Sequence, residues 1–175
     1  MEPTLTRVRL IEEREKASSS QLDVYDHIAA SRGGRMIRPF AAMLHRPDLA
    51  RAVADVGAVI RFQSTLSDHD RELAIVTTAI ERDCAFEWES HRPLAVEAGV
   101  AEPTLVAVAD GGAVSDRRDG EIVELVRQLC RVGPDGGEPY DAALDRYGET
   151  GFVELSVLVG YYSMMAVFMK ACDAC

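Results

Sequence analysis

The stretch from Gly151 to Ala171 constrains the fold most, because it is apolar on nearly every side. As a helix it would be long enough to cross a membrane. However, it contains Glu154, and no second span of this kind accompanies it. A helix that is apolar all round can also lie at the centre of a large core or between subunits. We therefore expect a long buried helix near the end of the chain and no membrane partner.

Helical spacing of apolar residues recurs along the rest of the chain. Two clear stripes fall in residues 46–66 and 67–84, formed by Leu49, Val53, Val56 and Ile60 and by Leu73, Val76, Thr77 and Ile80. Ser67 or Asp68 is suited to cap the second helix. Residues 35–40 are expected to form an extended link, because the residue before a proline avoids the helical region.

These patterns predict an all-α fold. Strand-like alternation never extends beyond a few residues. The chain has 175 residues, which is enough for one domain with a substantial core. We expect a single-domain helical bundle of seven to nine helices over residues 21–175, with a polar extension over residues 1–20 and a long apolar C-terminal helix.

The net charge and the cysteine content indicate which partners the protein can bind and in which cellular compartment it is expected. The formal net charge is −10, and an acidic surface repels phosphate backbones, so nucleic-acid binding is not expected. The four cysteines do not form a dense disulfide framework, and the first twenty residues contain no apolar run suited to a signal peptide. Both features predict a cytoplasmic protein.

The segment "RDCAFEWESH", residues 82–91, concentrates reactive side chains. On a helix, Cys84, Glu87 and His91 fall within an arc of roughly 60°, and Trp88 flanks them. Glu72 lies at the edge of the apolar stripe of the preceding helix and reaches the same pocket if the two helices form a hairpin. Two carboxylates, an imidazole and a thiol against an apolar wall suit proton-transfer chemistry.

The same residues also have ordinary explanations. A Glu–His pair four residues apart is common on solvated helix surfaces, and a single cysteine on an apolar face is usually a small core residue. Glu87 and His91 would supply only two metal ligands, so no metal is expected. Arg38 belongs to a cluster of three arginines that could bind a substrate carboxylate or simply lie on the surface.

Residues 71–100, "RELAIVTTAIERDCAFEWESHRPLAVEAGV", resemble the carboxymuconolactone decarboxylase family, which also contains the alkylhydroperoxidase D proteins. The resemblance extends outward to about residues 22–171. It implies an all-helical, alkylhydroperoxidase D-like bundle that assembles as a trimer or hexamer. It also implies an active site around His91 on one helix and Glu72 on the helix before it.

The resemblance leaves the reaction open. The peroxidase branch has a Cys-x-x-Cys pair before the histidine, and here the first cysteine matches Cys84 while the second position is Glu87. The "EWESH" form resembles the decarboxylase-like members. It implies a cofactor-independent acid–base enzyme of the decarboxylase or lyase type, acting on a small unsaturated or lactone carboxylic acid, with His91 as proton donor and Glu87 or Glu72 orienting it.

Two alternatives remain. One is a hydroperoxide reductase with peroxiredoxin-type activity, in which Cys84 reacts and an outside thiol resolves it. The other is an oligomeric helical scaffold without catalytic activity.

Overall fold

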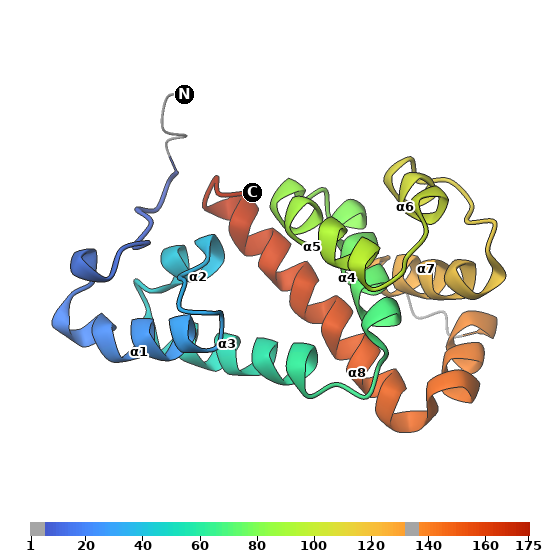
Figure 1. Cartoon of the computed structure of the whole chain (residues 1–175), viewed down its shortest axis with the longest axis horizontal. Coiled ribbons are helices and arrows are strands. Elements are labelled where there is room, and N and C mark those ends of the chain that lie inside the picture. The colour runs from blue at the N-terminus through green and yellow to red at the C-terminus, as the bar shows by residue number, and fades with distance from the viewer. Residues whose placement is uncertain (1–5, 132–136) are drawn as a thin grey trace. The chain divides into compact units, whose positions relative to one another are not determined.

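The computed structural model describes residues 6–131 and 137–175, and in these ranges it contains helices and no strands (Figure 1). This confirms the predicted all-α fold. The helices are η1 (Arg14–Lys16), α1 (Ser19–Ala30), α2 (Arg38–Met43), α3 (Pro47–Phe62), α4 (Asp68–Glu81), α5 (Ala85–Glu97), α6 (Glu102–Ala109), α7 (Arg117–Cys130) and α8 (Glu138–Ala171).

The helices divide into two compact units. The first runs to Gln63 and also includes Phe168–Cys175, and the second is Ser64–Val167. In the first unit, α1 and α2 pack against α3. The segment before α1 is not wholly solvated, because Ile11 is fully buried and its N–H donates to the Ala41 carbonyl at 3.0 Å.

Helix α4 forms the centre of the second unit. It contacts α5, α6 and α7, and its residues from Glu72 to Ala79 are all buried. Ser67 is its N-cap, as one of the two predicted options, and the Ser67 hydroxyl accepts a hydrogen bond from the Asp70 N–H at 3.1 Å. Because α4 is central and nearly fully buried, its polar residues lie in a low-dielectric environment. An ionised carboxylate there needs an ion-pair or hydrogen-bond partner.

The predicted long apolar C-terminal helix is present as α8. Its helical conformation is interrupted at Gly148, where φ is 63° and ψ is −178°. Beyond this break, one face of the helix is buried and the opposite face leaves Val153, Val157, Met164 and Val167 exposed. By length and composition α8 could cross a membrane, although a core helix passes the same test.

Two local predictions are wrong. Residues 35–40 are not one extended link, because α2 begins at Arg38 and accommodates Pro39 in its first turn, where a missing N–H costs nothing. In α3, Val53 and Ile60 are buried as expected, but Leu49 and Val56 are exposed. Small residues of α3, among them Ala50 and Ala54, take the inward positions instead.

Candidate functional site

A tight turn brings α5 back against α4. The Cys84 N–H donates to the Ala79 carbonyl at 2.9 Å, and Asp83 adopts a left-handed conformation with φ of 49°. Aspartate tolerates this region better than most residues. The turn makes α4 and α5 neighbours, which Figure 1 shows, so the hairpin that the site required is present.

The hairpin brings Glu72 and His91 together. Nδ1 of His91 lies 2.7 Å from Oε2 of Glu72, and their side chains are only 6% and 5% exposed. A carboxylate is an acceptor, so the imidazole N–H at Nδ1 donates to Glu72. This hydrogen bond fixes the ring orientation and leaves Nε2 as the nitrogen that can exchange a proton.

Two further groups face Nε2 of His91. Oε2 of Glu87 lies 3.7 Å away, and the hydroxyl of Tyr162 on α8 lies 3.3 Å away. The rings of His91 and Tyr162 meet edge to face, with centroids 5.2 Å apart and an interplanar angle of 85°. Glu87 and Tyr162 are both buried. The site therefore joins α4, α5 and α8 around one imidazole.

Sequence reasoning missed Tyr162. It lies 71 residues after His91, inside the apolar stretch that was interpreted only as a buried helix. The signal that could have found it is the phenol itself, because a tyrosine in an apolar helix needs a hydrogen-bond partner when it is buried.

Cys84 and Trp88 lie at the N-terminal end of α5, and Arg38 lies at that of α2. Cys84 is the N-cap of α5 and is 2% exposed, and Trp88 is half-buried one turn further along the same helix. Arg38 is the first residue of α2, in the first unit. Their roles at the site stay predictions. In the described part of the chain, no group of three or more His, Cys, Asp and Glu side chains could hold a metal ion.

A second polar centre surrounds Asp70 on α4. The Tyr147 hydroxyl donates to its carboxylate at 2.8 Å, and Arg118 and Arg146 each approach it to 3.1 Å. Burial alone would raise the pKa of Asp70, but the hydrogen bonds from Tyr147 and His69 and the charges of Arg146 and Arg118 outweigh it and hold the pKa below its ordinary value. This network connects α4 to α7 and to the first segment of α8.

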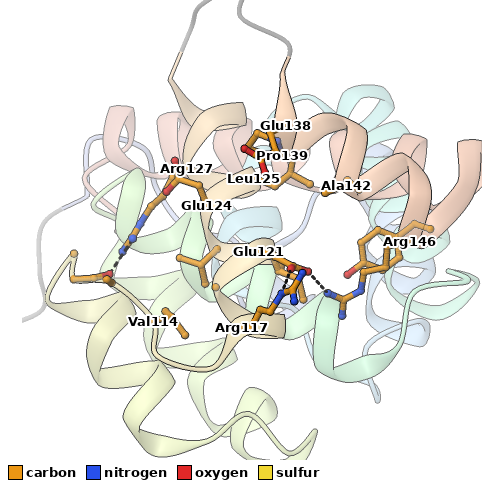
Figure 2. Close-up of a pocket in the computed structure, with 18 residues that line it drawn as sticks. Val114, Arg117, Glu121, Glu124, Leu125, Arg127, Glu138, Pro139, Ala142 and Arg146 are labelled. Atoms are coloured by element: carbon orange, nitrogen blue, oxygen red, sulfur yellow. Dashed lines mark hydrogen bonds and ion pairs between the residues drawn. The ribbon is translucent and has the colours of Figure 1, made fainter.

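A cavity of about 610 Å³ lies between residues 111–114, α7 and the first segment of α8. Figure 2 shows Arg117 and Arg146 converging on Glu121, with nitrogen–oxygen distances of 3.0 and 3.9 Å. None of the predicted site residues lines this cavity. The buried acid–base pair, and not the cavity, defines the candidate site, because both residues of the Glu–His pair are predicted from the sequence to be reactive and neither of them lines the cavity.

The second unit is therefore an all-helical unit built around a buried Glu–His pair, a site of the acid–base class. Residues 47–127 match the model of the carboxymuconolactone decarboxylase family, so the chain contains a domain of that family. The matched range includes Glu72, Glu87 and His91 and ends before α8. The wider resemblance, over residues 22–46 and 128–171, lies outside it. No curated protein matches the chain.

Proposed function

We propose that this protein is a cofactor-independent acid–base enzyme of the decarboxylase or lyase type, acting on a small unsaturated or lactone carboxylic acid. The observation that supports it is the buried 2.7 Å contact between Glu72 and Nδ1 of His91. Both residues lie in the range that matches the family. A carboxylate that fixes one imidazole nitrogen leaves the other free to act as general acid or base.

The reaction needs one proton donor and a site that stabilises developing charge. When the substrate carboxylate departs as carbon dioxide, its bonding electron pair stays on the substrate as a delocalised carbanion or dienolate. Protonated His91 then donates its Nε2 proton to that carbon and is reprotonated from water. Glu72 stabilises the imidazolium, and its burial strengthens this interaction.

Other residues take supporting roles in this proposal. Glu87 lies 3.7 Å from Nε2, too far for a hydrogen bond, and acts through its charge on the protonated imidazole. Trp88, on the same helix as His91, contributes an apolar wall for the substrate.

The test measures carbon dioxide release from a panel of unsaturated lactone carboxylic acids. His91→Asn should lower kcat/KM by about 10²- to 10⁴-fold, which is the usual contribution of a general acid. Glu72→Gln should lower it less, because the amide oxygen still accepts from Nδ1 but carries no charge. Cys84→Ser is the matched control and should keep its activity. Loss of turnover in Cys84→Ser alone would contradict the proposal.

One observation favours the alternative function, that of a hydroperoxide reductase. Cys84 is the N-cap of α5. When reduced, a thiol at that position has its thiolate stabilised by the helix dipole. The thiolate would attack the O–O bond of a hydroperoxide, release an alcohol and become a sulfenic acid, which an external thiol then reduces. Intact mass of the protein after hydroperoxide treatment distinguishes this reaction, and an unchanged Cys84 with no peroxide consumed excludes it.

We also propose that the protein forms a homo-oligomer through α8. The exposed residues Val153, Val157, Met164 and Val167, together with Gly160, follow one another at intervals of four, three, four and three residues. This is the heptad spacing of a seam between packed helices. A second copy of the chain is the occupant that this spacing favours.

A further inference from the structure

We infer that Tyr162 is a positioning residue that keeps the buried imidazole of His91 hydrogen-bonded in both of its protonation states. The kinetic part of this inference rests on the proposed function, in which His91 gains and loses a proton. The family match ends at residue 127, so Tyr162 lies outside it.

The geometry places the Tyr162 hydroxyl at the nitrogen that exchanges the proton. It lies 3.3 Å from Nε2 of His91, on the opposite side of the ring from the Glu72 contact at Nδ1. Neutral His91 keeps its proton at Nδ1, so Nε2 then presents a lone pair that needs a donor. The phenol supplies that donor.

Glu87 is the other group that faces Nε2, and it cannot replace the phenol in both states. An ionised carboxylate only accepts hydrogen bonds, so it favours the protonated imidazole and repels the lone pair of the neutral one. A hydroxyl both donates and accepts. When His91 is protonated, the Tyr162 oxygen accepts from Nε2–H, and when His91 is neutral, the Tyr162 O–H donates to Nε2.

Burial makes this exchange of roles important. His91 and Tyr162 are 5% and 4% exposed. Without access to bulk water, an imidazole nitrogen that loses its partner stays unsatisfied. The ring of Tyr162 is held on two sides, edge to face with His91 and, at 5.4 Å between centroids, edge to face with Tyr161. The phenol is therefore held in place before any substrate binds.

The decisive experiment compares Tyr162→Phe with the wild-type protein by ¹⁵N NMR of labelled histidine. The chain has four histidines, and the signals of His91 are identified by their loss in His91→Asn. We expect the Nε2 resonance of neutral His91 to move toward that of a nitrogen without a hydrogen bond, while Nδ1 keeps its protonated signature. Tyr140→Phe, on the same helix and packed only against Phe152 among the ring contacts of the described residues, is the matched control and should leave both signals unchanged.

Kinetics provide the second measurement. Phenylalanine preserves the edge-to-face packing, so the variant should fold, which its thermal unfolding verifies. We expect kcat to fall by about tenfold, the equivalent of one lost hydrogen bond, with KM nearly unchanged. An unchanged Nε2 resonance would overturn the role of Tyr162 whatever the activity. If the resonance moves but the wild-type protein releases no carbon dioxide, the proposed function fails and the positioning contact stands.

Discussion

Two buried carboxylates of α4 differ in what surrounds them, although only one residue separates Asp70 from Glu72. Glu72 pairs with the His91 imidazole and lies 3.5 Å from Arg71, whereas Asp70 is contacted by two guanidinium groups, those of Arg118 and Arg146, by the Tyr147 phenol and, at 3.2 Å, by the His69 ring. Burial and the hydrogen bond to Asp70 raise the pKa of Tyr147 well above its ordinary value, so the phenol remains a donor. Asp70 therefore suits a structural role and Glu72 a role in proton exchange.

Asp70 should make stability depend on pH. Its pKa is lowered in the folded state, so the unfolded chain binds the proton more tightly, and the stabilisation is present above the unfolded pKa of about 3.9. It is lost as the pH falls through the lower, folded pKa. Asp70→Asn should destabilise the protein by about 1–3 kcal/mol at pH 7, because it removes the charge of a buried carboxylate that accepts hydrogen bonds from Tyr147 and Arg146. Urea unfolding at pH 7 and near pH 3 measures this.

The difference between Asp70→Asn and wild type should shrink at the lower pH, because the unfolded wild-type chain takes up a proton at Asp70 there and the folded protein does so less readily. Asp68→Asn is the control, because the Asp68 carboxylate is exposed and its ion pair with Arg71 is open to water on the aspartate side. An equal destabilisation of Asp70→Asn at both pH values would contradict the assignment of its stabilising effect to charge.

Helices were predictable from the sequence to the extent that their signals are local. Ser67 capping α4 and the regular apolar spacing of α4 are set by residues within a few positions of each other. The inward face of α3 was not predictable, because burial of Ala50 and exposure of Leu49 depend on which elements pack against the helix. The contacts of Tyr162 and Asp70 join residues 48 to 77 positions apart, and single-chain periodicity does not report such pairs.

The break in α8 has a local cause that can be tested. Gly148 combines φ of 63° with ψ of −178°, a conformation that is essentially restricted to glycine. Gly148→Ala should destabilise the protein by about 1–3 kcal/mol. Gly160→Ala, within regular helix and with open space around the added methyl group, should be neutral or stabilising by up to about 1 kcal/mol. Urea unfolding compares the two variants, and equal effects would show that the strain at Gly148 is unimportant.

On the scale of the whole molecule, α8 has two different faces. Its buried face includes Leu155, Leu158, Tyr162 and Met165, and Tyr162 reaches the candidate site. Its exposed face carries the heptad-spaced residues Val153, Val157, Gly160, Met164 and Val167, which we call the stripe. A chain with net charge −10 repels its own copies at long range, so association needs an apolar contact that outweighs this repulsion at short range. The stripe supplies such a contact.

A glutamate within the stripe should therefore separate the copies. In the proposed seam, Val157→Glu places like charges against each other and requires their desolvation, which costs more than the lost apolar contact. We expect light scattering after gel filtration to show a trimer or hexamer for the wild type and a smaller species for Val157→Glu, with unchanged helical content. Val106→Glu, at an exposed valine of α6, is the matched control and should keep the wild-type mass.

The same variant tests whether a second copy of the chain or a lipid surface covers the stripe. A glutamate in the stripe disrupts an interface between copies, whereas binding to a lipid surface is measured directly by flotation with vesicles. The charged variant should then lose mass without any change in vesicle binding, and the wild type should not float with vesicles of neutral lipid. A monomeric wild type, or flotation that Val157→Glu abolishes, would contradict the interface between copies, and flotation would favour a membrane partner for α8.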